Sequence, residues 1–445
     1  MTVVIETDRI GGGGRERGLI RALSPWGLGA AVANMIIGSG IFVLPARMAA
    51  AVGSAAPFYY IACALGVGAV ALCFAEAGSR IAASGGVSAC VEAAFGRFAG
   101  YMCSVALWLG AGLAAAGVGA AIADTVARIV PALQAPLLRD AFILLLFAAI
   151  AGINILGVKR GGGLVLLTLT LKLIPLALLI AVGAPHIDPA HLAEGTPAKA
   201  NVGRAMLLGV FAFMGMETAL GVSGEVRRPG RNVPLGLLGA LAFVTILYML
   251  IQLTAQGVLG AGLVVSKTPL ADTAARIYPP LAGLLLATGA VSMLGYLSSD
   301  ILSAPRILFG MGRDGYLPKI LARVHPTART PYVAIILHVV LIGALAVTGA
   351  FESLAILSTL VTVFVYIAGC AAAVVLQRRG VAEEGEALNF RFTPIAAAVG
   401  VVSMVWLALQ GTWQEGAGVA AAFVVASLIY VAALRRKSGA QEEPG

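Results

Sequence analysis

Long apolar stretches separated by short polar segments dominate the pattern of the chain. A hydrocarbon core about 30 Å thick is crossed by about 20 apolar residues in an α-helix, and about twelve stretches reach this length. They are continuous and lack the alternation of a membrane β-barrel, so the pattern predicts an all-α membrane protein with about twelve transmembrane helices. The expected spans are 27–50, 57–82, 92–129, 139–157, 163–183, 204–225, 234–257, 281–310, 332–350, 354–377, 393–411 and 417–435.

The first span contains glycines where a helix is expected to break. Gly38 and Gly40 flank Ser39 ahead of Pro45, and each glycine weakens helical preference by roughly 1 kcal/mol relative to alanine. A broken helix exposes backbone N–H groups that hydrocarbon cannot satisfy, and helix N-termini favour anions such as a substrate carboxylate. The alternative is that both glycines only let another helix pack closely.

A second interruption is expected in 204–225, where Gly215 precedes Glu217. It follows the first by about 175 residues, and such a pair of broken spans predicts a transporter made of two inverted five-helix repeats with a site at their interface. The expected organisation is a cytoplasmic tail (1–24), a transmembrane domain (25–435) and a second cytoplasmic tail (436–445). Within the transmembrane domain, repeat one is expected over about 25–183, repeat two over about 204–377, and two additional helices over about 393–435.

Three ionisable residues are expected inside the membrane, where a charge costs at least about 2.5 kcal/mol and is a functional candidate by default. Glu217 is expected to bind a proton, to face a substrate cation, or to brace the broken helix with a hydrogen bond. Lys172, in the middle of the fifth span, fits either a fixed ammonium at a position that binds sodium in relatives or a proton carrier. Asp300 is its expected partner, because pairing would lower the burial cost of both charges.

Other polar residues are expected to have structural roles. Glu76 and Arg80, one helical turn apart, are predicted to form a surface pair or a gate element. His338 is expected to be a satisfied packing histidine, and Trp108 a packing or interface residue. For the two histidines in the loop 184–203, a solvated loop is favoured over a metal site.

Composition supports an integral membrane protein. The 445 residues are 60% hydrophobic and 11% charged, against roughly 25% charged residues in soluble domains. The net charge of +9 reflects topology, since a cytoplasmic N-terminus places roughly 22 Lys and Arg inside against roughly 7 outside. We therefore expect a multi-pass protein of the cell (inner) membrane with both termini cytoplasmic, as monomer or homodimer, without a nucleic-acid partner. The five cysteines show no CxxC spacing, so neither disulfides, a metal nor a cofactor is expected.

Four motifs occur in an order and spacing that resemble the amino acid-polyamine-organocation (APC) superfamily, in its amino acid permease and antiporter type. They are similar to the first-helix signature, the loop between helices two and three, helix six with its following loop, and the loop after helix eight. The matching segments are 38–45, 76–81 with Gly85–Gly86 and Phe95–Gly96, 213–217 with 225–234, and 312–318. The resemblance implies a five-plus-five inverted repeat and alternating access.

The resemblance also implies how a substrate would be held. In the family an amino acid's carboxylate lies at the first break, here Ser39 and Gly40, and its ammonium at carbonyls of the first and sixth helices. Lys172 matches a lysine at the sodium position of sodium-independent members, some of them proton-coupled. The expected substrate-binding residues are Met35, Gly38, Ser39, Gly40, Phe211, Phe213, Met214, Gly215, Glu217, Ser358 and Tyr366, with Phe211 or Phe213 as the gating aromatic, and the expected coupling residues are Lys172, Asp300 and Glu217.

Departures from the arginine/agmatine antiporter branch concern the side-chain pocket. Ala111 and Ala115 stand where that branch has polar or aromatic residues, and Asp300 stands where it has a gating tryptophan. In the loop between helices two and three, Ala82 departs from the family's usual proline. Arginine specificity is therefore not implied. Small apolar residues favour a neutral substrate, whereas Glu217 and Asp300 would admit a cationic one.

The sequence thus predicts a secondary active transporter of amino acids that is sodium-independent and works as an exchanger or with protons. The alternatives are an amino-acid-binding membrane sensor on the same fold, and a polyamine or cationic amino acid antiporter. An enzyme is not expected, because the spans contain no nucleophile–base pair or metal cluster.

Overall fold

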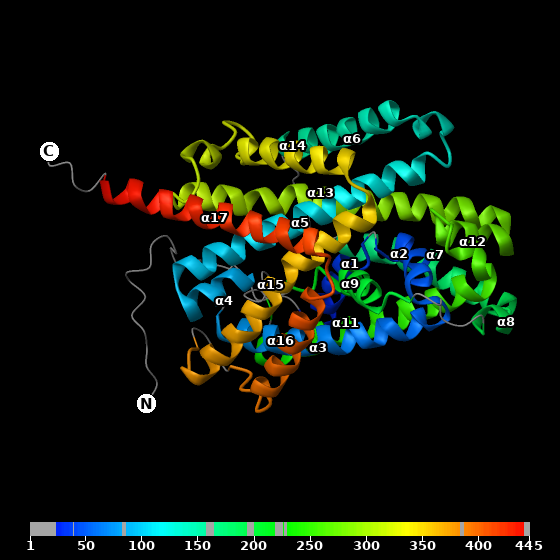
Figure 1. Ribbon diagram of the computed structural model, residues 1–445, viewed down its shortest axis with the longest axis horizontal. Helices are drawn as coiled ribbons and strands as arrows, with labels where there is room; N and C mark the ends of the chain where they lie inside the picture. The colour runs from blue at the N-terminus through cyan, green and yellow to red at the C-terminus, as the bar shows by residue number, and fades with distance from the viewer. Residues whose placement is uncertain are drawn as a thin grey trace.

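The computed structural model describes residues 24–38, 40–81, 86–156, 164–193, 200–218, 226, 229–382 and 387–439. Ser39, the loop segment with Ala82 and Gly85, most of 219–228 and both expected tails (apart from Ser24 and 436–439) therefore lie outside the described residues. Within those ranges every regular element is a helix, which confirms the all-α class (Figure 1).

The helices follow one another with short connections. Short 3₁₀ turns link several of them, among them Gly53–Ala55, Pro131–Gln134, Ala184–His186, Gly260–Leu263 and Lys319–Ala322. The helix bounds are α1 Pro25–Ile36, α2 Gly40–Val52, α3 Ala56–Arg80, α4 Gly86–Phe95, α5 Arg97–Val126, α6 Pro136–Leu156, α7 Leu164–Gly183, α8 Pro189–Leu192, α9 Val202–Phe213, α11 Pro229–Leu259, α12 Pro269–Ile277, α13 Pro279–Arg313, α14 Tyr332–Thr348, α15 Phe351–Arg378, α16 Thr393–Ala408 and α17 Trp413–Gly439.

Eight helical stretches among the described residues are long and apolar enough to cross a membrane, which makes this a multi-pass membrane protein. Four shorter apolar helices, α4, α9, α14 and α16, accompany them. The stretches are Gly40–Arg80, Arg97–Val126, Pro136–Leu156, Leu169–His186, Gly230–Leu263, Pro279–Arg313, Phe351–Arg378 and Trp413–Arg435.

Glycines in the left-handed region divide two of the apolar stretches. Gly53, at φ 59°, separates α2 from α3, so the 41-residue stretch Gly40–Arg80 consists of two helices. Gly96, at φ 89°, separates α4 from α5. The single predicted span 92–129 was therefore wrong at its start. Helix α4 has only 10 residues, or about 15 Å at 1.5 Å per residue, which is too short to cross a bilayer.

Helix α5 lies at the centre of the bundle and packs against α15, α13 and α14, while α3 packs against α11, α15 and α16. Helix α5 carries many small residues, and its glycines lie close to its neighbours: a Cβ at Gly117 would be 3.4 Å from the Leu354 Cβ of α15. Small residues allow helices to approach closely in a membrane, where association depends on van der Waals packing. The α17 helix contacts α5 and α15 from outside this bundle.

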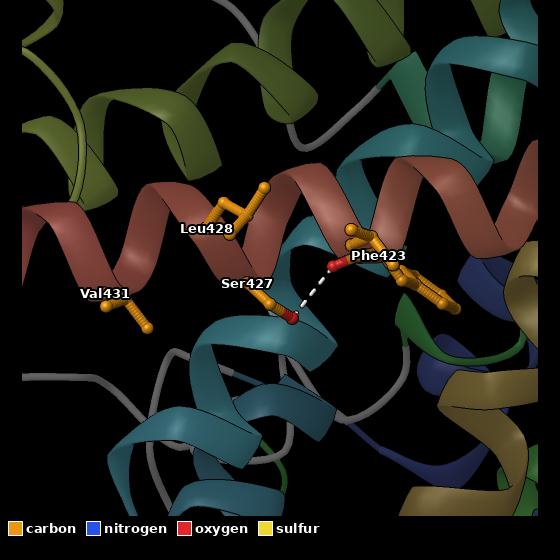
Figure 2. Close-up of a pocket in the computed structure, with 5 residues that line it drawn as sticks. Phe423, Ser427, Leu428 and Val431 are labelled. Atoms are coloured by element: carbon orange, nitrogen blue, oxygen red, sulfur yellow. Dashed lines mark hydrogen bonds between the residues drawn. The ribbon is translucent and has the colours of Figure 1, made fainter.

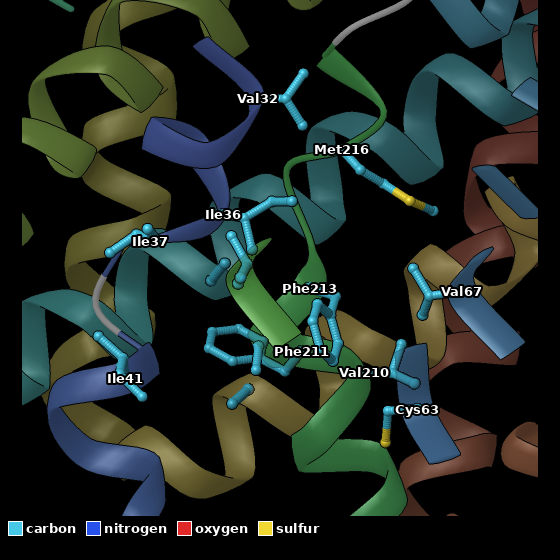
Figure 3. Close-up of a cluster of buried hydrophobic side chains, with 14 of the residues drawn as sticks. Val32, Ile36, Ile37, Ile41, Cys63, Val67, Val210, Phe211, Phe213 and Met216 are labelled. Carbon is cyan, nitrogen blue, oxygen red and sulfur yellow. The ribbon is translucent and has the colours of Figure 1, made fainter. Parts of the chain in front are cut away.

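The buried core continues to the ends of α1 and α9, where both helices stop inside the protein. Figure 3 shows Ile36 and Ile37 at the end of α1 near Phe211 and Phe213 of α9, with Ile41 at the start of α2. All five side chains are buried. The helix ends are therefore surrounded by packed side chains rather than by lipid.

Glu76 and Arg80 form a buried ion pair, so the prediction of a surface pair was wrong. The Arg80 Nε donates to the Glu76 Oε1 at 2.7 Å, and neither side chain is more than 2% exposed. The connector between α15 and α16 covers the pair: Arg80 donates to the Val381 carbonyl and to the Asn389 amide oxygen, and the Phe390 N–H donates to the Glu76 Oε2. Every strong polar group of the pair has a partner.

Candidate functional site

Helix α1 stops at Ile36, and α2 begins at Gly40. The side chain of Ser24 caps the start of α1 by accepting from the Gly27 N–H at 3.1 Å. At the other end the Gly38 N–H turns back to the Ile36 carbonyl at 2.7 Å, which is not a helical bond. The chain is thus interrupted at the position that the two glycines predicted.

Donors from three other helices satisfy the carbonyl groups at the end of α1, since the last carbonyls of a helix have no partner within it. Lys172 of α7 donates to the Asn34 carbonyl at 3.2 Å and to the Ile37 carbonyl at 3.0 Å. The Tyr248 hydroxyl donates to Ile36, and Ser292 donates to Gly38, both at 2.9 Å. The expected pairing of Lys172 with Asp300 was wrong, because the ammonium is used by the backbone of the interruption.

The second interruption follows α9, which ends at Phe213. Residues 214–217 form a turn in which Gly215 has φ 106°. The Gly215 N–H donates to both carboxylate oxygens of Glu217, at 3.1 and 3.0 Å, and the Tyr366 hydroxyl donates to its Oε2 at 3.1 Å. Glu217 thus braces the turn, one of the roles expected for it.

The two interruptions touch each other. A Cβ built on Gly215 would lie 3.3 Å from both the carbonyl carbon and the carbonyl oxygen of Met35. This is tighter than ordinary van der Waals contact, and the positive φ excludes most side chains as well. Glycine at 215 therefore lets the backbone of the second turn lie against the end of α1.

A cavity of about 110 Å³ lies at this contact. Since a water molecule occupies about 30 Å³ of liquid, a cavity of this size suits a few waters or a small polar solute. Eight predicted residues line it: Met35, Gly38, Gly40, Phe211, Met214, Gly215, Glu217 and Asp300. The rest of the wall is Ile36, Leu107, Ala111, Ala114, Ala212, Thr218, Tyr296, Ser303 and Thr362.

Three other predicted residues lie behind this wall. Phe213 is fully buried, with its ring 5.8 Å from that of Tyr248. Ser358 donates to the Gly110 carbonyl at 2.7 Å, and Tyr366 reaches the cavity only through Glu217. These side chains hold the wall in place.

Sequence reasoning missed Tyr296 and Ser303, which line the cavity beside Asp300. Both lie on the same face of α13 as Asp300, four residues before it and three residues after it. Residues at these spacings are neighbours on a helix surface. Helical periodicity counted from Asp300 was therefore the signal that could have found them.

Asp300 has a partner that was not predicted. The Nε2 of His338 lies 2.9 Å from its Oδ2, and the Trp108 indole N–H donates to the Nδ1 of the same ring at 3.1 Å. His338 is fully buried and satisfied, as expected, but it also joins Trp108 of α5 to a cavity carboxylate of α13.

The loop histidines have ordinary partners. The His186 Nδ1 lies 3.0 Å from the Val182 carbonyl, and the His191 Nδ1 lies 2.9 Å from the Gly257 carbonyl. Within the described part of the chain, no group of three or more His, Cys, Asp or Glu side chains could hold a metal ion.

A second hollow, of about 280 Å³, lies on the surface of α17 (Figure 2). Its residues, Phe423, Val424, Ser427, Leu428 and Val431, all belong to that helix. Its hydroxyl group is already used, because Ser427 donates to the Phe423 carbonyl at 2.8 Å. An apolar hollow on one outer helix has no group to orient a polar ligand, so the cavity at the interruptions is the candidate site.

Comparisons with known proteins agree with this geometry. The family model for amino acid permeases matches residues 23–434. The chain is 29% identical over 407 residues to the serine/threonine exchanger SteT of Bacillus subtilis (strain 168), covering 87% of this chain and 89% of that protein.

Two further relatives are similar over most of their length. The branched-chain amino acid permease BcaP of Bacillus subtilis (strain 168) is 25% identical over 429 residues, 91% of each chain. The vacuolar cationic amino acid transporter 8 of Arabidopsis thaliana is 25% identical over 441 residues, 93% of this chain and 72% of that protein. Because the family model covers nearly the whole chain, this protein belongs to the amino acid permease family of the APC superfamily.

Proposed function

We propose that this protein is a secondary active transporter that moves an amino acid across the membrane by alternating access and without sodium. The observation that carries the proposal is the contact between the two interruptions, Gly215 against Met35, with a small cavity beside it that some polar groups line. Interrupted helices that meet inside a bundle bring helix ends of both partial charges to one place, which suits a zwitterion.

The substrate carboxylate would bind at the start of α2, beside Gly40, where the N–H groups of the first helical turn have no acceptor within the helix. Its ammonium would bind at the carbonyl ends of α1 and α9, at Met35, Phe211 and Met214. Each helix end carries partial charge of the matching sign. The carboxylate of Glu217 adds negative charge on the ammonium side.

Lys172 supports a sodium-independent mechanism. Its ammonium lies within 3.0–3.2 Å of two carbonyl oxygens at the end of α1, and backbone carbonyls of broken helices are the usual ligands of a coupling sodium ion. A fixed cation would take the place of that ion. Coupling would then come from exchange or from protons, and the name of the relative SteT, a serine/threonine exchanger, supports exchange.

The fold proposed for this mechanism is a pair of inverted repeats, about 25–183 and about 204–377, followed by two helices at about 393–435. Both termini would be cytoplasmic, in line with the excess of Lys and Arg on that side. The protein would act in the cell membrane as a monomer or homodimer.

Flux through reconstituted protein tests the proposal. Purified protein in liposomes, preloaded with an unlabelled amino-acid mixture and diluted into sodium-free buffer, should accumulate labelled L-alanine or L-serine by counterflow. Imposing a proton gradient without internal amino acid separates proton-driven uptake from exchange. A sensor on the same fold would bind the amino acids but show no counterflow, and that result would overturn transport.

The variant Lys172→Ala tests the coupling role. Removing the ammonium leaves the end of α1 without two charge-assisted donors, each worth about 1.5–3 kcal/mol. Counterflow should fall at least tenfold, or become sodium-stimulated, while the protein remains monodisperse in detergent. Uptake and pH dependence equal to wild type would show that Lys172 has no role in coupling.

A further inference from the structure

Only one of the two carboxylate oxygens of Asp300 has a hydrogen-bond partner among the described residues. Its Oδ2 accepts from His338, whereas Oδ1 has no hydrogen-bond partner among the residues that the structure describes. Asp300 is 7% exposed and lines the cavity. A buried carboxylate oxygen beside a cavity is available to a bound molecule, because leaving it unpaired carries a desolvation cost.

Trp108 fixes the protonation of His338. An indole N–H can only donate, so the Nδ1 of His338 must accept from it. The proton of the neutral ring then lies on Nε2 and is donated to Asp300. A charged imidazolium would need protons on both nitrogens and would lose the bond from Trp108. The two hydrogen bonds thus hold His338 as the tautomer that donates to the carboxylate of Asp300.

Within the described part of the chain, no positively charged side chain pairs with the carboxylate of Asp300. Lys172 donates to the end of α1, and no lysine or arginine forms an ion pair with Asp300 or Glu217. The other titratable groups at the cavity are Tyr296, which lines it, and Tyr366, which donates to Glu217. The cavity therefore carries more carboxylate than a single α-ammonium would balance.

The cavity that Asp300 lines is small, about 110 Å³, and its wall is partly polar. Ala111 and Thr362, with Ser303, line the same cavity. The cavity therefore has space for a short substrate side chain rather than a long one.

We propose that Asp300 selects amino acids with a short side chain that carries a hydrogen-bond donor, a hydroxyl or an ammonium group. His338, oriented by Trp108, is the positioning residue that aims the carboxylate into the cavity. The inference rests on the proposed transport function and adds the substrate class to it.

Three probes of nearly equal size test the selection. L-Alanine, L-serine and L-2,3-diaminopropionate end in CH₃, CH₂OH and CH₂NH₃⁺. A hydrogen bond to a charged acceptor corresponds to roughly a 10- to 100-fold change in affinity. Wild-type protein in liposomes should therefore transport serine and diaminopropionate with a KM at least about tenfold below that of alanine.

Neutralising Asp300 should remove most of the difference. In Asp300→Asn the preference for diaminopropionate over alanine should disappear, measured as the ratio of the two KM values. The matched control is Asp124→Asn, which removes a carboxylate that pairs with Arg139 away from the cavity and should leave the three KM values unchanged.

Two variants separate positioning from packing. His338→Gln retains a side-chain donor and should restore selection that His338→Leu loses. Trp108→Phe removes the indole donor that orients the ring of His338. The KM of diaminopropionate relative to that of alanine should then rise in Trp108→Phe, but not in the control Trp406→Phe.

Each outcome decides a different point. If wild type transports all three amino acids with equal KM, the inference is wrong and the transport function stands. If none of the three moves but another amino acid shows counterflow, the inference is wrong and transport stands, whereas no counterflow of any amino acid would make both wrong. If selection is present but Trp108→Phe keeps the KM ratio of wild type, the positioning role is wrong. If Asp300→Asn fails to fold, the KM values of the three amino acids with wild-type protein still test the selection.

Discussion

Two groups of carboxylates inside the helix bundle differ in what surrounds them. Glu76 faces the guanidinium of Arg80 and a backbone N–H from the connector after α15, so its charge is fully matched. Among the residues that the structure describes, the donors to Glu217 and Asp300 at the cavity are a glycine N–H, a tyrosine hydroxyl and a histidine that tryptophan orients, without a lysine or arginine.

The difference separates structure from function. A matched buried pair fixes the position of two elements, here α3 and the connector, and loses much stability if one member is removed. An unmatched carboxylate at a cavity stabilises little, and its charge is available to a ligand. The comparison predicts that variants of the first group lose stability and variants of the second lose transport.

The largest effect is expected for Arg80→Met, which removes the cation and leaves Glu76 buried and unpaired. The free energy of unfolding should fall by about 3–5 kcal/mol. Thermal unfolding of detergent-purified protein measures the loss. The double variant Glu76→Leu with Arg80→Met should recover much of it, because the two residues are coupled. An Arg80→Met protein as stable as wild type would contradict the matched-pair interpretation.

A smaller loss is expected for Gly215→Ala at the contact between the interruptions. The backbone at φ 106° and the 3.3 Å approach to Met35 should cost about 1–3 kcal/mol and abolish counterflow. The control is Gly239→Ala in α11, where a Cβ meets nothing within 4 Å; it should be neutral or slightly stabilising. Normal transport by Gly215→Ala would show that the close contact is dispensable.

Glu217→Gln tests the unmatched group directly. The amide oxygen can still accept from the Gly215 N–H, so the unfolding free energy should change by less than about 1 kcal/mol. Counterflow should nevertheless fall at least tenfold, because the negative charge beside the ammonium site is lost. The reverse result, unstable but active protein, would place Glu217 with Glu76 as a structural carboxylate.

The smallest effect is expected for a half-buried carboxylate outside the membrane spans. Burial raises the pKa of Glu92, with a further rise from Asp314 and an opposing effect of Arg97. The folded protein thus binds this proton more strongly than the unfolded chain, so stability should rise as pH falls through the folded-state pKa. Glu92→Gln should gain less than about 1 kcal/mol at neutral pH and lose that rise. Melting curves across the acidic range measure both, and an unchanged pH profile would exclude the contribution of Glu92.

Local sequence predicted the interruptions because their cause is local. The paired glycines around Ser39 and the glycine before Glu217 weaken a helix wherever they occur. The backbone at Gly96 also depends on glycine. The break there was not predicted, because the apolar pattern was read as one continuous span.

Long-range partners could not be read from spacing. Lys172 and Asp300 were paired as the two opposite charges in the spans, yet the lysine bonds to backbone carbonyls and Asp300 bonds to His338. Glu76 was placed on the surface because the segment that covers it comes about 300 residues later in the chain. Such contacts depend on how distant helices and connectors pack.

All five cysteines of the protein are free and buried, and Cys63 lies where α3 meets α9. A Cβ on Gly209 of α9 would lie 2.5 Å from its sulfur, so the thiol is shielded by the helix that ends at the second interruption. A maleimide reagent can reach this thiol only when those two helices separate. The rate of alkylation of Cys63 in the natural protein, separated from that of the other four cysteines by peptide mapping, therefore reports helix separation with and without added amino acid and needs no engineered label.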